Sequence, residues 1–120
     1  YAFELKGGKK TILNCEKKRI DVVIGLANSD NTSNEITEIY KKHKVTNIIR
    51  MSSSLKFCVL AAGEADIYAA KARAYEWDIA AGHAILEHSG GSVTTHNGEE
   101  FLYGKEDYKN ISIIAKGKLK

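Results

Sequence analysis

Short segments rich in Val and Ile alternate with segments of helical periodicity over most of the chain, and this alternation limits the folds that it can adopt. Arg19–Leu26 has the composition of a buried strand, and a cluster of turn-forming residues follows it. Ile36, Ile39 and Tyr40 then recur at the spacing of one helical face. Because strands that alternate with amphipathic helices pack into layers, the pattern predicts an α/β domain of two or three layers.

The remaining elements follow from the same criteria. Further strands are predicted near Thr11–Cys15 and over Val45–Ile49, Ala65–Ala69, Ser92–His96, Phe101–Tyr103 and Ile111–Ala115. The first helix is expected to begin at a Thr32-x-x-Glu35 capping box. The third helix is predicted over Asp78–Ser89, where two glycines close it.

The second helix is expected to start after the serines at 52–54 and to end near Gly63. Its predicted apolar face consists of Leu55, Cys58, Val59 and Ala62. In the strand that follows, Asp66 and Tyr68 are expected on one side and Ile67 on the other, because side chains alternate along a strand.

Length and composition point to one unit. The 120 residues have room for a single α/β domain, which we expect to span 1–120, and 43% of them are hydrophobic, enough for a core. No apolar run approaches the roughly 18–20 residues of a transmembrane helix, so no membrane span is expected. The chain begins at Tyr1 and its only methionine is Met51, so we expect a processed chain or a piece of a longer one.

Charge and cysteine content bear on partners and location. The net charge is +3 and only three of the 18 basic residues are Arg, so a nucleic-acid polymer is not expected as a partner. Cys15 and Cys58 form no CxxC pair and are expected to be reduced thiols, which favours a cytoplasmic location. Peripheral association with a membrane stays open. His83 and His88 lie five positions apart, which does not favour a shared zinc ion.

The most specific motif is EWDIAAGHAILEHSGG, residues 76–91. Asp78 stands where a helix is expected to begin, and the small side chains of Ala80 and Ala81 leave the first turn open to an anion. The Asp78 carboxylate can cap the helix, or it can bind a hard cation such as Mg²⁺ beside a phosphate. The spacing leaves both roles open. Trp77, just before Asp78, is expected to anchor the core.

A second candidate segment is SSSLKFC, residues 52–58. The hydroxyl groups of Ser53 and Ser54 at a helix N-terminus, with Lys56 one turn later, can hold a phosphate. The alternative is an ordinary helix cap beside a surface lysine.

Taken in order, these motifs resemble the inositol monophosphatase superfamily of Mg²⁺-dependent phosphatases. The run SSSLKFCVLAAGEADIY followed by EWDIAAGHAILEHSGG is most similar to its 3′(2′),5′-bisphosphate nucleotidase branch. The later Gly98…Leu102-Tyr103-Gly104-Lys105…Asn110 pattern is similar as well. The resemblance implies a mixed β-sheet with flanking helices, as in the C-terminal half of the family's layered α-β-α-β-α sandwich.

The resemblance also implies a chemistry, which is attack of metal-activated water on a phosphate monoester. Asp78 matches a metal-ligating aspartate, and Ser53, Ser54 and Lys56 match positions that contact the second phosphate of a bisphosphate nucleotide. Ala80 and Ala81 open the helix beside the bound phosphate. The implied substrate is adenosine 3′,5′-bisphosphate, a by-product of sulfate activation, and the implied cofactor is Mg²⁺.

The sequence departs from the family pattern in two ways. The upstream glutamate motif and the DPxDGT motif, which supply the other metal ligands, do not occur, so the N-terminal metal-site domain is expected to be missing. The family's SRSH turn carries Ser29 and Asn31 in place of its Arg and His, and the Arg of a Pro-Arg pair is Ala70. Lys71 and Arg73 are nearby candidates for the lost arginine.

These departures leave several functions open. The chain is expected to be the C-terminal domain of a nucleotide phosphatase and to be inactive alone, because one aspartate cannot supply the roughly six oxygen ligands of a Mg²⁺ ion. The alternatives are a catalytically dead remnant that binds a phosphate or a partner, and an inositol or sugar phosphatase of the same superfamily. A domain without its partner is also expected to self-associate through its uncovered face.

Overall fold

The computed structural model describes residues 1–16, 19–28 and 33–118. Thr32, the first residue of the predicted capping box, lies outside the described residues, as do Ser29 and Asn31 of the altered turn. The first helix, α1 (Asn34–Lys42), is nevertheless confirmed. Ser33 caps it, because its hydroxyl oxygen accepts a hydrogen bond from the Ile36 N–H at 3.3 Å.

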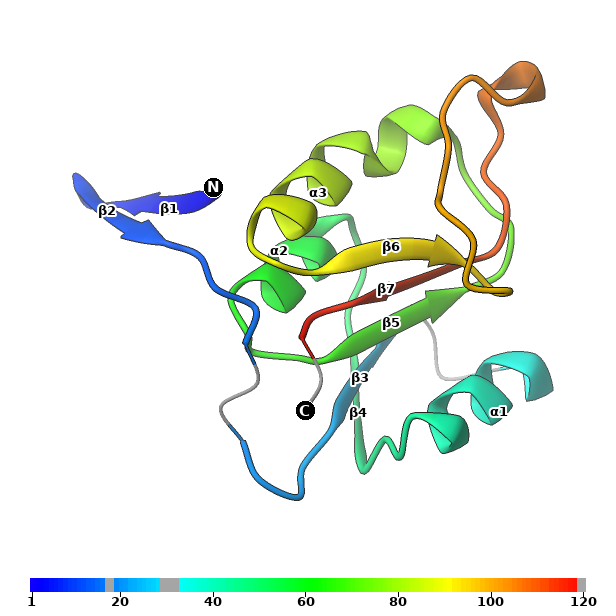
Figure 1. Ribbon diagram of the computed structural model, residues 1–120, viewed down its shortest axis with the longest axis horizontal. Coiled ribbons are helices and arrows are strands. Elements are labelled where there is room, and N and C mark those ends of the chain that lie inside the picture. The colour runs from blue at the N-terminus through cyan, green and yellow to red at the C-terminus, as the bar shows by residue number, and fades with distance from the viewer. Residues whose placement is uncertain (17–18, 29–32, 119–120) are drawn as a thin grey trace.

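A mixed sheet of five strands forms the centre of the molecule (Figure 1). Its order is β4-β3-β5-β7-β6, with bounds β3 (Ile24–Ala27), β4 (Asn47–Arg50), β5 (Ile67–Ala70), β6 (Ser92–Thr95) and β7 (Ile113–Lys116). β3 pairs in parallel with both β4 and β5, whereas β7 is antiparallel to β5 and β6. The layered α/β class predicted from the alternation is therefore confirmed.

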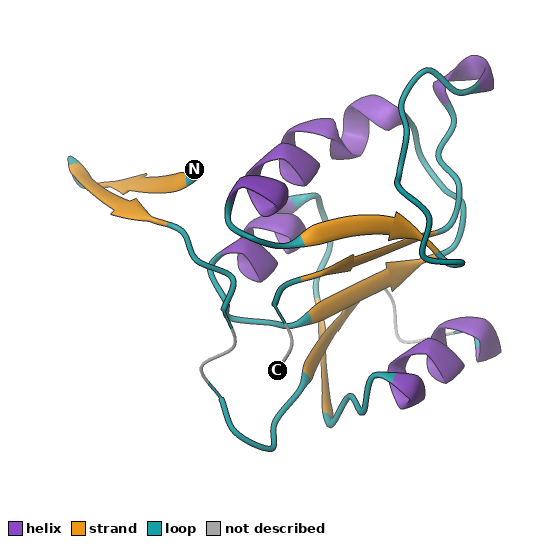
Figure 2. Ribbon diagram, in the orientation of Figure 1, coloured by secondary structure: helices purple, strands orange, loops and turns teal. Residues whose placement is uncertain are grey.

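Helices cover both faces of this sheet, which gives three layers (Figure 2). α2 (Leu55–Ala61) and α3 (Glu76–His88) pack against each other on one face, over a core that includes Leu26, Phe57 and Leu86. On the other face α1 packs against β5, and a second core cluster forms around Tyr40.

β5 passes through the middle of both clusters, because its side chains alternate between the two faces. Tyr68 belongs to the core under α2 and α3, whereas Ile67 and Ala69 belong to the core under α1. The predicted division of Ile67 from Tyr68 is confirmed. Asp66, just before the strand, is 2% exposed and forms a 2.7 Å ion pair with Arg19.

An antiparallel hairpin precedes the sheet and extends away from it (Figure 1). Its strands are β1 (Phe3–Lys6) and β2 (Lys9–Ile12), and every residue of both strands is exposed. β2 overlaps the strand predicted near Thr11, whereas β1 was not predicted, because Phe3–Lys6 lacks the Val and Ile that marked the other strands.

Three details of the sequence interpretation were wrong. The buried face of α2 consists of Lys56, Phe57, Leu60 and Ala61 rather than the face through Cys58. Phe57, Leu60 and Ala61 have the same i, i+3, i+4 spacing as Leu55, Cys58 and Val59, so only packing on the sheet distinguishes the two faces. Phe101 is buried beyond the end of β6 but forms no strand with the two residues after it. Trp77 is 64% exposed and stacks on Tyr75, with ring centroids 4.6 Å apart.

No helix among the described residues is long and apolar enough to cross a membrane. The short 3₁₀ turn η1 (Glu106–Tyr108) lies between β6 and β7.

Candidate functional site

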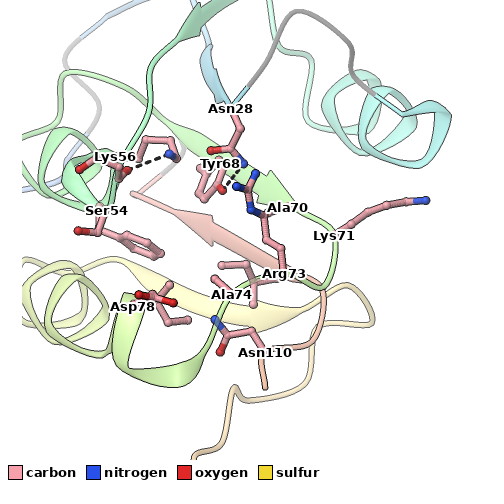
Figure 3. Close-up of a pocket in the computed structure, with 14 residues that line it drawn as sticks. Asn28, Ser54, Lys56, Tyr68, Ala70, Lys71, Arg73, Ala74, Asp78 and Asn110 are labelled. Carbon is pink, nitrogen blue, oxygen red and sulfur yellow. Dashed lines mark hydrogen bonds between the residues drawn. The ribbon is translucent and has the colours of Figure 1, made fainter. Parts of the chain in front are cut away.

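A cavity of about 260 Å³ opens where several chain segments meet at one end of the sheet (Figure 3). Asn28 follows β3, Arg73 follows β5, Ser54 and Lys56 lie at the start of α2, and Asp78 lies in the first turn of α3. β3 and β5 are parallel, so their carboxyl ends lie at the same edge of the sheet, which is where α/β folds commonly bind ligands. Ser53 also lines this cavity.

Lys56 is the most buried charged group of the cavity, with 4% of its surface exposed. Its Nζ donates hydrogen bonds to the carbonyl oxygens of Ser53 at 2.8 Å and Met51 at 3.3 Å, and it lies 4.9 Å from the centre of the Tyr68 ring. Burial lowers the pKa of Lys56, and the positive charge of Arg73 lowers that pKa further. No carboxylate of the described residues forms an ion pair with Lys56, so an anion in the cavity would be its first counter-charge.

Arg73 brings a second cation to the same cavity. Its side chain extends back toward Tyr68 and Asn28, whereas the side chain of Lys71 points away from them (Figure 3). The Nζ of Lys71 lies 3.8 Å from the carboxylate of Glu35 on α1. Lys71 is nevertheless one of the residues that line the cavity. Within the described part of the chain, no carboxylate forms an ion pair with Arg73.

Tyr68 and Asn28 form a polar wall between these cations. The Asn28 side-chain amide donates a 2.7 Å hydrogen bond to the Tyr68 hydroxyl. Burial raises the pKa of Tyr68, so its hydroxyl stays protonated and can donate to a ligand. The sequence analysis placed Tyr68 on one side of its strand without giving it a role at the site, and it gave no role to Asn28, although the position of Asn28 directly after a strand was a usable signal.

Ser53 and Ser54 contribute differently to the α2 N-terminus. The Ser53 hydroxyl oxygen accepts from the Leu55 N–H at 3.2 Å, and the Ser53 backbone has a φ of +82°. The Ser54 side chain makes no capping hydrogen bond to α2. Both serines are exposed, and they line the cavity together with the buried Lys56.

Asp78 lies across the cavity from Asn28 and Tyr68 and caps its own helix, α3 (Figure 3). Its Oδ2 accepts a hydrogen bond from the Tyr75 N–H at 2.9 Å. Ala80 and Ala81, the other residues that the motif placed at the phosphate, are exposed on α3 but do not line the cavity.

Asn110 adds an unsatisfied acceptor to the lining. It is 9% exposed, and its Nδ2 donates to the Tyr75 carbonyl at 2.9 Å. Its Oδ1 is buried and receives no hydrogen bond from the described residues. A buried acceptor without a donor costs free energy, so a ligand hydroxyl or amine reaching it would be stabilised.

The described residues do not by themselves fit a Mg²⁺ ion. Asp78 is the only carboxylate among the described residues that line the cavity, and no group of three or more His, Cys, Asp or Glu among them could hold a metal. Because Mg²⁺ takes about six oxygen ligands, Asp78 could supply one of them and water or other residues would have to supply the rest.

Comparison with known proteins agrees with this fold. The model of the inositol monophosphatase family matches residues 5–119. A 3′(2′),5′-bisphosphate nucleotidase CysQ of Buchnera aphidicola is 38% identical over 111 residues, which cover 92% of this chain and 40% of that protein. The crystal structure of CysQ from Bacteroides thetaiotaomicron superposes with a TM-score of 0.71 at 34% identity, over 88% of this chain and 41% of that one.

A shorter relative has a different coverage. An uncharacterised protein from Rhizobium leguminosarum is 42% identical over 81 residues, which cover 62% of this chain and 85% of that protein. The chain thus spans about two fifths of the length of the two CysQ proteins and most of the Rhizobium protein. With the family model matched over nearly the whole sequence, the chain belongs to the inositol monophosphatase family.

Proposed function

We propose that this chain is the substrate-binding part of a Mg²⁺-dependent phosphomonoesterase that acts on a 3′(2′),5′-bisphosphate nucleotide, with adenosine 3′,5′-bisphosphate as its substrate. The observation that carries the proposal is the pair of cations, Lys56 and Arg73, in one cavity without a carboxylate partner among the described residues. The likeness to CysQ proteins at 34–38% identity supports a nucleotide rather than another phosphate ester.

In this proposal each side chain acts on the substrate directly. Lys56 attracts a phosphate as a point charge, and the hydroxyl groups of Ser53 and Ser54 donate to its oxygens. Asp78, in the first turn of α3, contributes one ligand to a metal ion. When bound, Mg²⁺ would activate water and neutralise charge on the phosphoryl oxygens and on the leaving oxygen of the nucleoside.

The 120-residue chain is proposed to bind this substrate without hydrolysing it. The reason is that Asp78 is the single carboxylate among the described residues that line the cavity, and one carboxylate cannot hold a metal ion in the fixed geometry that in-line attack requires. Hydrolysis would then need metal ligands from outside these residues.

The test has two parts. Phosphate release from adenosine 3′,5′-bisphosphate is measured on the purified chain with and without Mg²⁺, and calorimetric titration measures the binding of the same ligand. Binding without release is the expected result. Mg²⁺-dependent release that Asp78→Asn abolishes would overturn the proposed inactivity. Tighter binding of inositol 1-phosphate or fructose 1,6-bisphosphate than of the nucleotide would favour an inositol or sugar phosphatase of the same family.

A second candidate is a binding module that never takes part in hydrolysis. The Rhizobium relative favours it, because the match to this chain covers 85% of that protein. Adding a separately produced N-terminal half of a CysQ protein distinguishes the two. Restored phosphate release supports the phosphatase, and binding that stays unproductive supports the module.

We further propose that the chain associates with a second copy of itself through the free edge of β1. In an antiparallel pairing centred on Leu5, Glu4 of one copy lies opposite Lys6 of the other, so the edge is complementary to itself in charge. Phe3 and Leu5 of β1 are 47% and 68% exposed, and an exposed apolar strand at a sheet edge tends to pair with another chain.

The proposed location is the cytoplasm. Cys15 and Cys58 are free thiols, which persist in a reducing compartment.

A further inference from the structure

Among the described residues that line the cavity, Arg73 is the one long cationic side chain that has no role in the family resemblance and no ion-pair partner. It follows β5 by three residues, in a segment that turns from the sheet toward α3. Its side chain extends over the cavity and brings the guanidinium group toward Tyr68 and Asn28 (Figure 3). The position that the resemblance gives to an arginine is Ala70, which is buried at the end of β5.

The charges around Arg73 favour an anionic ligand. Lys56 and Arg73 repel each other across the cavity, and no carboxylate among the described residues is paired with either. Asp78, on the opposite wall, has one oxygen engaged with the Tyr75 N–H. A phosphate between the two cations would replace repulsion by two attractions, and a guanidinium can bind two phosphate oxygens at once.

The opposite wall favours a ligand that also carries a hydrogen-bond donor. On the side of Asp78, the buried Oδ1 of Asn110 has no donor among the described residues. The Asn28–Tyr68 pair, beside Arg73, offers further polar contacts. Inorganic phosphate could bind the two cations, whereas a phosphorylated nucleoside could bind the cations through its phosphate and donate a hydrogen bond to Oδ1 of Asn110.

Resting on the proposed function, we propose that Arg73 is the specificity-determining residue for the second phosphate of the bisphosphate nucleotide. Where the family pattern has an arginine, this chain has Ala70, and Arg73 takes over the role of that arginine from a position three residues further along the chain. The guanidinium binds the phosphate in the cavity together with Lys56, and a nucleoside monophosphate forgoes this contact.

The matched control is Lys71, which has the same charge and lies two residues earlier in the same segment. Its side chain points away from Tyr68 and lies near Glu35, so Lys71→Ala removes one positive charge without removing the proposed contact. Arg73 is exposed, and the described residues give it no hydrogen bond, so Arg73→Ala should leave the fold intact. Arg73→Lys keeps the charge but cannot bind two oxygens in parallel.

The experiment is calorimetric titration of the wild-type chain and these variants with adenosine 3′,5′-bisphosphate, adenosine 5′-monophosphate and inorganic phosphate at low salt. Arg73→Ala is expected to weaken bisphosphate binding about tenfold, Lys71→Ala less than about twofold, with Arg73→Lys between them. The affinity for the monophosphate should change little in all of them. Thermal melts check that each variant is folded.

The outcomes separate the two proposals. If the wild-type chain binds none of the three ligands, the proposed function fails and this inference fails with it. If the wild-type chain prefers the bisphosphate but Arg73→Ala and Lys71→Ala weaken its binding equally, the assignment of Arg73 is overturned while the proposed function stands. Equal losses for the bisphosphate and the monophosphate in Arg73→Ala would also overturn the specificity role.

Discussion

The backbone N–H of Tyr75 donates a 2.9 Å hydrogen bond to Oδ2 of Asp78, so the carboxylate of the most specific motif stabilises the start of its own helix. The described residues donate no hydrogen bond to the other oxygen, Oδ1. The two roles that the sequence left open, helix cap and metal ligand, are therefore compatible, because each can use a different oxygen.

This geometry predicts unequal effects for two substitutions at Asp78. Asp78→Ala removes the acceptor and should lower the free energy of unfolding by about 0.5–2 kcal/mol, the usual cost of losing a helix cap. Asp78→Asn keeps an oxygen at the same place and should cost less. Urea denaturation of both variants measures the difference. Equal losses would mean that the charge of Asp78, rather than its hydrogen bond, stabilises α3.

Gly82 provides a second prediction, at the contact between α2 and α3. A Cβ atom added at this position would lie 2.8 Å from both Cβ and Cγ of Phe57, which is too close for the two helices to keep their distance. Gly82→Ala should therefore destabilise the chain by about 1–3 kcal/mol, despite the roughly 1 kcal/mol that alanine contributes to helix propensity. Thermal or urea unfolding gives the value.

The control for Gly82 is a double variant. Phe57→Ala removes Cγ and the ring of the opposing side chain, so Gly82→Ala should be less harmful in that background than in the wild type. Strictly additive free energies would show that Phe57 is not the source of the clash.

The contact between Glu76 and Lys105 predicts a pH dependence of stability. Glu76 is 5% exposed, and its carboxylate accepts hydrogen bonds from the Lys105 side chain and from the N–H groups of Gly104 and Lys105. The hydrogen bond from the Lys105 side chain is the main cause that lowers the pKa of Glu76 below its ordinary value of 4.5. The stabilisation is therefore fully present above pH 4.5 and is lost as the pH falls through the lowered pKa.

The measurement compares urea midpoints of wild type and Glu76→Gln between neutral and acidic pH. The wild type should be more stable at neutral pH, and the difference should shrink as the solution becomes acidic. Glu106→Gln is the control, because Glu106 is exposed in the nearby turn η1. A difference between wild type and Glu76→Gln that stays constant with pH would contradict the prediction.

The fold was predictable from the sequence wherever one local pattern decided it. The helix of Ile36 and Tyr40 followed from their spacing, and the strand of Ile67 and Tyr68 from its composition, because nothing distant had to be known. The buried face of α2 depended on which side meets the sheet, and the strand β1 depended on a cross-strand partner. Both are tertiary relations that residue spacing does not contain.

The candidate site was predictable in part for the same reason. Ser53, Ser54 and Lys56 come from one segment, so a motif groups them, and the motif around Asp78 marks a helix start. Their meeting with Arg73 and Asn110 depends on the parallel pairing of β3 with β5 and on the long return of the chain to β7. The burial that lowers the pKa of Lys56 also arises only from that assembly.

The β1 edge yields the last prediction. If two copies pair through β1 as proposed, sedimentation should show an apparent mass that rises with protein concentration. A fluorescent dye that binds exposed apolar surface should also bind less per chain at high protein concentration. Leu5→Lys puts like charges opposite each other at the centre of the pairing and should give a monomer at all concentrations. Lys9→Glu on β2 is the matched control, because it changes a charge on the same hairpin away from that edge and should leave association intact. A wild-type chain that sediments as a monomer throughout would refute the pairing, as would an equal loss of association in Lys9→Glu and Leu5→Lys.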